Sequence, residues 1–125
     1  MEALDGADVI AFADAAQWES WLADHHERKA DVWVKIAKKN SGKTSVTLAE
    51  ALDVALCYGW IDSQRKTDDE DHYLQRYSPR RPDSSWSELN AEKVEALIAA
   101  GRMREPGLAA ILAAKADGRW PMRGR

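Results

Sequence analysis

The chain has 125 residues, the length of one ordinary domain, and 45% of them are hydrophobic and 31% charged. These proportions are typical of a folded globular protein and exclude a disordered or fibrous one. The net charge of −3 and the pI of about 5.6 disfavour nucleic acid as a partner, because nucleic-acid-binding domains carry a basic surface. The sequence has no apolar run of membrane-spanning length and no signal-peptide pattern, so we expect a single cytoplasmic domain over residues 1–125 without a transmembrane segment.

The charges are unevenly distributed along the chain. Residues 1–31 contain eight acidic and two basic residues, whereas residues 101–125 contain six basic and two acidic residues. This asymmetry is typical of solvated helix faces and, over about residues 119–125, of a loose basic tail. A homodimer that pairs the opposite ends of two chains, and an acidic partner for the tail, remain as alternatives.

The N-terminal region predicts a strand followed by a helix. Residues 8–12 favour a short edge strand. Asp14 and Gln17 have the spacing of a capping box, and the helix that they begin should end near residues 25–26. Its core-facing side chains, three and four residues apart, are Trp18, Trp21 and Leu22.

A second strand and a second helix follow. Residues 32–37 alternate as a half-buried strand, with Trp33 on the outer face. Residues 40–42 have the composition of a turn. Residues 47–50 form another capping box, and the helix that follows should end at Gly59.

The remaining elements are a hairpin and two helices. Residues 60–66 and 72–78 predict two antiparallel strands around an acidic turn. We expect one helix capped by Asn90 and another that begins at Pro106, packed together as a helical hairpin. Their predicted inward side chains are Val94, Leu97, Ile98, Leu108, Ile111 and Leu112. Because strands and helices do not alternate regularly, we predict an α+β fold: a small, mostly antiparallel sheet with helices packed on one face and a C-terminal helical hairpin.

Residues 37–44 come close to the phosphate-binding pattern G-x-x-x-x-G-K-[ST], with Ala37 in place of the first glycine. A phosphate loop needs its helix to begin at the Lys-Thr step, where the helical N–H groups face the phosphates. Here the helix should begin three residues later, at Thr47. A basic surface turn is therefore favoured over a nucleotide site.

Other reactive residues have ordinary explanations. Cys57 lies in the last turn of a helix, where the helix dipole disfavours a thiolate, so we expect a buried and inert thiol. His25 and His26 are adjacent and point about 100° apart on a helix, so they cannot share a metal ion. The acidic residues 68–71 lack the spacing of a calcium loop. We therefore predict no metal site and no cofactor.

The best candidate site lies on and after the hairpin. Trp60, Asp62 and Gln64 share one strand face by the two-residue period, and a five-residue turn would place Asp62 opposite Arg76. A register shifted by two residues would place Gln64 there instead. Arginine forks suit carboxylates and phosphates, and tryptophan faces suit planar groups. This face indicates either a small-ligand pocket or an internal Asp62–Arg76 ion pair with tryptophans in the core. The loop beyond the hairpin adds Arg80, Arg81 and Trp86 to the candidate ligand-binding residues.

Residues 50–62, 73–82 and 86–87 carry a likeness to a known family. In these segments, and less closely over nearly the whole chain, the sequence resembles the bacterial YdeI/OmpD-associated family, also called bacteriocin-protection proteins. The resemblance implies a role in protection against bacteriocins or cationic antimicrobial peptides, a stress response, and implies no catalytic residues. Ser63 departs from it, since the family often has glycine there.

Three functions are compatible with these patterns. The favoured one is a non-enzymatic domain that binds a small anionic ligand. The second is an enzyme that uses Asp62, with His72, as acid or base on an anionic substrate. The third is an interaction module whose basic tail binds acidic partners, RNA included. The sequence does not decide whether the protein is an enzyme.

Overall fold

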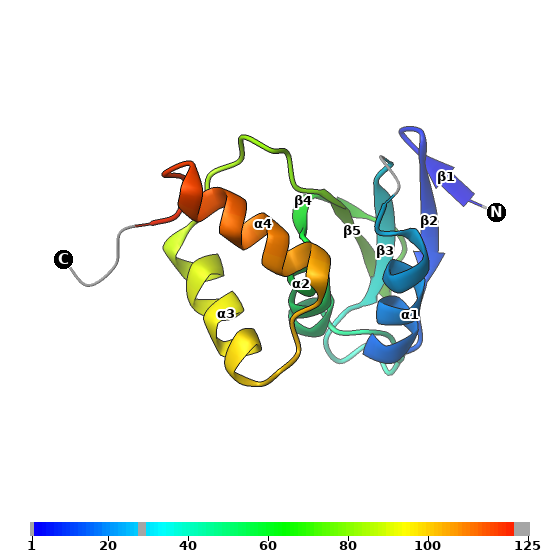
Figure 1. Cartoon of the computed structure of the whole chain (residues 1–125). Helices are drawn as coiled ribbons and strands as arrows, with labels where there is room; N and C mark the ends of the chain where they lie inside the picture. The colour runs from blue at the N-terminus through cyan, green and yellow to red at the C-terminus, as the bar shows by residue number, and fades with distance from the viewer. Residues whose placement is uncertain (1, 28–29, 122–125) are drawn as a thin grey trace.

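The computed structural model describes residues 2–27 and 30–121, which form nine elements of secondary structure (Figure 1). The strands are β1 (Glu2–Leu4), β2 (Ala7–Ala11), β3 (Val32–Ala37), β4 (Trp60–Thr67) and β5 (His72–Pro79). The helices are α1 (Ala15–His25), α2 (Leu48–Cys57), α3 (Glu88–Ala99) and α4 (Glu105–Ala116). These bounds confirm the predicted hairpin, now β4 and β5, and each of the predicted helices.

The strands form one mixed sheet in the order β1-β2-β3-β5-β4. Neighbouring strands are antiparallel except for β2 and β3, which are parallel. Helices α1 and α2 cover one face of the sheet, and α3 and α4 both contact α2 (Figure 1). The fold is therefore α+β, as predicted. The prediction of an edge strand over residues 8–12 was wrong, because β1 pairs along the outer side of β2.

The main hydrophobic core lies between α1, α2 and the sheet. Trp18 and Leu22 of α1 are completely buried there. The indole N–H of Trp18 donates to the carbonyl oxygen of Ala51 at 2.9 Å, so the polar edge of this ring is satisfied by the backbone of α2. Two of the predicted N-caps are also confirmed, since the side chains of Asp14 and Thr47 each accept a backbone N–H from three residues further on.

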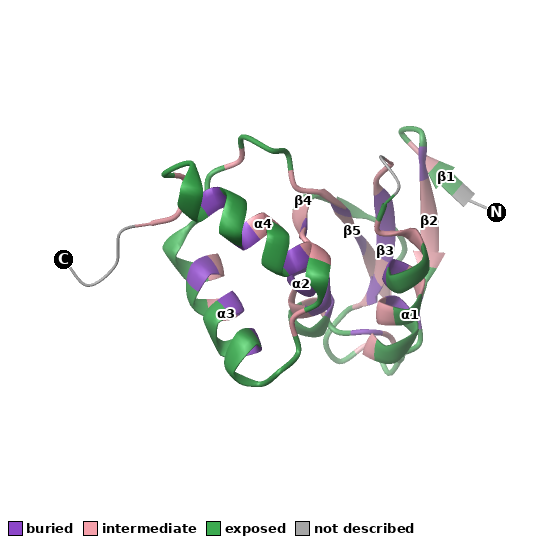
Figure 2. Ribbon diagram, in the orientation of Figure 1, coloured by how far each residue is buried: buried purple, intermediate pink, exposed green. Residues whose placement is uncertain are grey.

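Helix α4 meets α2 through small residues. A Cβ atom at Gly107 would overlap the carbonyl oxygen of Cys57, so only glycine permits this approach. Most of the surface of α3 and α4 is exposed, and the buried positions form a narrow stripe on each helix (Figure 2). The buried residues predicted correctly are Val94, Leu97 and Ile111. The prediction was wrong for Ile98, Leu108 and Leu112, which are exposed.

Helix α3 begins two residues before the predicted cap. Its N-cap is Ser87, whose hydroxyl oxygen accepts the backbone N–H of Asn90 at 3.1 Å. Asn90 therefore lies in the first turn of the helix rather than at its cap.

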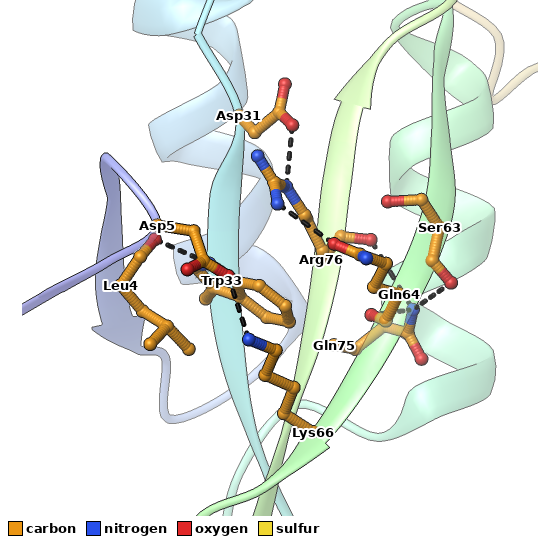
Figure 3. Close-up of polar contacts among 9 residues, drawn as sticks. All are labelled: Leu4, Asp5, Asp31, Trp33, Ser63, Gln64, Lys66, Gln75 and Arg76. Carbon is orange, nitrogen blue, oxygen red and sulfur yellow. Dashed lines mark hydrogen bonds and ion pairs between the residues drawn. The ribbon is translucent and has the colours of Figure 1, made fainter.

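On the face of the sheet that the helices do not cover, residues of the two edge strands and of the turn after β1 cover the central strand β3. Trp33, predicted on the outer face of a half-buried strand, is completely buried, and its indole N–H donates to the carbonyl oxygen of Leu4 at 3.0 Å. Lys66 of β4 forms an ion pair of 2.8 Å with Asp5, in the turn after β1 (Figure 3). Because β1 and β4 are opposite edges, this contact requires a strongly curled sheet. Strand β3 is consequently buried on both faces.

A β-bulge interrupts β4 between Asp62 and Arg65, where this strand has one residue more than β5. Gln75 of β5 is the buried polar side chain beside the bulge, with 2% of its surface exposed. Its amide nitrogen donates to the carbonyl oxygens of Ser63 and Gln64 at 3.3 and 3.0 Å, and its amide oxygen accepts from Arg65 Nε at 3.2 Å. Gln75 therefore supplies the hydrogen bonds that the interrupted ladder lacks (Figure 3).

We expect Gln75→Leu to lower the free energy of unfolding by about 1–3 kcal/mol, because it leaves the bulge carbonyls without a donor in a partly buried place. Urea denaturation followed by circular dichroism measures this change. Gln64→Leu is the matched control, with an expected loss below about 1 kcal/mol, since Gln64 is exposed. Equal losses in the two variants would contradict this role of Gln75.

Candidate functional site

The bulge separates the strand residues that the sequence placed on one face. Trp60 and Asp62 lie before the bulge and share the helix-covered side with Tyr77, the residue that pairs with Asp62. Gln64 lies within the bulge and meets Arg76 on the opposite side, where its side-chain oxygen accepts from Arg76 Nη1 at 3.0 Å. The prediction of a common face was therefore wrong, because the extra residue changes the direction of the side chains that follow it.

Arg76 is held in a structural network. Its Nε atom lies 2.7 Å from Asp31 Oδ2, and its guanidinium group lies 5.3 Å from the centre of the Trp33 ring (Figure 3). An internal ion pair was one of the two interpretations left open by the sequence. Such a pair exists, but its acid is Asp31 rather than Asp62.

A pocket of about 320 Å³ lies between the loop that follows β5 and helix α4. Four of the seven predicted site residues line it: Trp60, Arg80, Arg81 and Trp86. Apolar residues at the end of β5, in the loop that follows it and on α4 form much of its wall: Pro79, Pro82, Pro106, Ala110 and Ala113. The other predicted residues, Asp62, Gln64 and Arg76, do not line it.

Arg80 is positioned by backbone and ring contacts. Its N–H donates to the carbonyl oxygen of Gly59 at 3.0 Å, which fixes the loop to the start of β4. Its guanidinium group lies 3.6 Å from the centre of the Trp86 ring, a close cation–π contact. Nη1 donates to Ser84 Oγ at 2.8 Å and to the carbonyl oxygen of Ser85 at 3.3 Å. Both of these hydrogen-bond acceptors are neutral.

Arg119 enters the pocket from the segment after α4. Its Nη1 donates to the carbonyl oxygen of Ser84 at 2.7 Å, so both arginines bind the same serine. Its Nη2 lies 3.0 Å from Asp117 Oδ2. The Arg119 side chain is 16% exposed and that of Asp117 is 60% exposed, so solvent screens much of this ion pair.

The positive charge of the pocket is only partly compensated. Burial, and then repulsion by the Arg119 guanidinium, lower the pKa of Arg80 to about 10, which leaves it protonated at neutral pH. The Nε atoms of both arginines are buried and lack a hydrogen-bond partner in the described part of the chain. Two like charges with unused donors form a site suited to an anionic group.

Arg119 was missed as a site residue because the sequence placed it in a loose tail. The structure holds it instead: its carbonyl oxygen accepts the N–H of Trp86 at 3.3 Å. The next residue, Trp120, lies with its ring 5.1 Å from the Trp86 ring. The sequence contained one signal for this role: an arginine, Arg119, stands directly before a tryptophan just after α4. The rest of the predicted tail, residues 122–125, lies outside the described residues.

The described ranges give two further findings. They contain no cluster of three or more His, Cys, Asp or Glu side chains that could hold a metal ion. They also contain no helix that is long and apolar enough to cross a membrane.

Cys57 has the surroundings of an inert thiol. It is buried at the end of α2, and burial raises the pKa of its thiol to about 11. At pH 8 we expect native Cys57 to react with iodoacetamide at least about 100-fold more slowly than the same residue in urea-unfolded protein, because thiolate is the reactive form. Mass spectrometry of the alkylated protein measures both rates. Equal rates would show that Cys57 is accessible and reactive.

Comparison with known proteins identifies the family of this chain. Residues 10–110 match the family described as Domain of unknown function (DUF8412). No curated protein and no solved structure matches the chain. The matched span runs from β2 into α4 and includes the loop with Arg80 and Trp86, but it ends before Arg119. Because it covers most of the sequence, the chain belongs to the DUF8412 family.

Proposed function

We propose that this protein is a non-enzymatic domain that binds a small anionic ligand in the pocket of Arg80 and Arg119. The observation that carries this proposal is the pair of partly buried guanidinium groups that share Ser84 and retain unpaired Nε atoms. Mutual repulsion of two such groups costs free energy. An anion that pairs with both guanidinium groups removes this cost.

The composition of the pocket wall supports an organic ligand. Three arginines and one aspartate line it, together with His26, so its charge favours a carboxylate or phosphate group. The prolines and alanines of the remaining wall offer apolar contact without hydrogen bonds. We therefore expect a compact ligand with one anionic end and one apolar end.

An enzyme that uses Asp62 has less support. Asp62 does not line the pocket. Its suggested partner His72 lies at the other end of the hairpin, where its Nδ1 atom is 3.0 Å from Asp69 Oδ1. General acid–base catalysis needs both groups within reach of one substrate.

The wider role rests on the sequence alone. Membership of the YdeI/OmpD-associated family, a protective or stress-response role, a cytoplasmic location and a homodimer stay predictions. If protection depends on the pocket, cells that express the Arg80→Ala variant should survive a cationic antimicrobial peptide less well than cells that express the wild type. Equal survival of the two kinds of cell would show that protection does not depend on the pocket.

The binding proposal predicts that Arg80→Ala and Arg119→Ala each weaken the binding of an anion by about 10- to 100-fold, since a hydrogen bond to a charged group contributes about 1.5–3 kcal/mol. Isothermal titration calorimetry with inorganic phosphate, benzoate and phenyl phosphate at physiological salt measures these affinities. Phenyl phosphate and benzoate should bind more tightly than inorganic phosphate, because they also contact the apolar wall.

Two control variants separate the pocket from other charged positions. Arg102→Ala removes an exposed arginine that lines no part of the pocket, and Asp62→Asn removes the carboxylate of the enzyme hypothesis. Arg102→Ala should leave the affinity within about twofold of wild type. Asp62→Asn should not weaken binding, because the Asp62 carboxylate acts on Arg80 as a negative charge and its removal makes the pocket more positive. The proposal fails if none of the three anions binds, or if Arg102→Ala weakens binding as much as Arg80→Ala.

A further inference from the structure

A second cavity, of about 750 Å³, lies beside the loop that connects β3 to α2. Its charged lining residues are Lys38, Lys39 and Lys43, and carboxylates are absent from its lining. The cavity thus gathers three positive charges in a chain whose net charge is −3. The cavity therefore has a local positive potential that the composition of the whole chain does not indicate.

The side chains of the lysines in this cavity form no ion pairs within the described part of the chain. All three lysines are exposed. Lys35, in contrast, lies on β3 and pairs with Asp68 at 3.2 Å. The cavity lysines are thus available to a ligand, whereas the strand lysine is occupied.

The floor of the cavity is apolar. Ile36 is buried in the main core, and Leu48 and Tyr73 are partly buried against the same core. The floor is therefore a partly exposed extension of the hydrophobic core, and covering it with an apolar group is favourable. Together, floor and lysines give the cavity one apolar and one cationic side.

The loop does not have the geometry of a nucleotide site, although its sequence comes close to the phosphate-binding pattern. Helix α2 begins at Leu48, and its capping box uses the N–H groups of Thr47 and Glu50. Within the loop, the N–H of Lys43 donates to Ser41 Oγ at 3.1 Å. These N–H groups are occupied, so the loop offers side-chain ammonium groups rather than a backbone cradle.

We propose that this cavity binds an anionic amphiphile: a carboxylate or phosphate head at the three lysines and a short alkyl chain over the floor of Ile36, Leu48 and Tyr73. Its volume lies within the roughly 300–1,000 Å³ of small-molecule sites. The site is separate from the Arg80–Arg119 pocket, with which it shares no lining residue. Its failure or success therefore leaves the proposed function of that pocket untouched.

Amide NMR titration of the ¹⁵N-labelled full chain tests this site with octanoate and octyl phosphate, each below its micellar concentration. We expect the amides of residues 36–49 and of Tyr73 to shift with both ligands. Octanol, which lacks the charge, and acetate and inorganic phosphate, which lack the chain, should bind at least about tenfold more weakly. The two anionic ligands distinguish a carboxylate from a phosphate head.

A charge-reversal variant and its matched control complete the test. Lys39→Glu with Lys43→Glu should weaken octanoate binding at least about tenfold, whereas Lys93→Glu with Lys115→Glu, with the same change of net charge, should alter it less than about twofold. Raising the salt concentration from about 0.05 to about 0.5 M should weaken octanoate and leave octanol unchanged. Octanol binding as tightly as octanoate, or inorganic phosphate binding as tightly as octyl phosphate, would overturn the proposal.

Discussion

The buried amide of Gln75 determines which side chains of β4 can act together. By bonding the carbonyl oxygens of Ser63 and Gln64, it stabilises an extra residue in the middle of an edge strand. Before the bulge, Trp60 turns toward the helices. After the bulge, Lys66 turns to the other face, where it lies over Trp33 and reaches the opposite edge of the sheet. The bulge that Gln75 stabilises thus lets β4 contribute Trp60 to the main core and Lys66 to the contact between the sheet edges. It also explains why the predicted site residues lie on two different faces.

The Arg80–Arg119 pocket depends on the start of the same strand. Gly59 has a φ of +77°, ends α2, and accepts the N–H of Arg80 through its carbonyl oxygen. A Cβ atom at Gly59 would lie 3.1 Å from the carbonyl oxygen of Pro106, so glycine also lets α4 approach. Three segments distant in sequence therefore meet at one residue, and the pocket forms between them. The two arginines are held near each other by this packing, against their mutual repulsion.

Local patterns predicted much of the fold, and contacts distant in sequence explain the errors. Capping residues such as Thr47, and the acidic turn of the hairpin, act over a few residues and can be read from the sequence. The bulge depends on Gln75, a residue of the partner strand, so a strict two-residue period gave the wrong face for Gln64. Of the candidate site, the loop with Arg80 was predicted, whereas Arg119 was missed because its role arises only when the chain end folds back onto that loop.

Arg80 and Arg119 form a pair of guanidinium groups suited to binding an anion. The most direct measurement is NMR of the arginine Nε–H groups during a titration with phenyl phosphate. We predict that the Nε–H signals of Arg80 and Arg119 shift together with one dissociation constant, while that of Arg76, already bonded to Asp31, stays in place. Unchanged signals from Arg80 and Arg119, or equal shifts in all three, would show that this pair does not bind the anion.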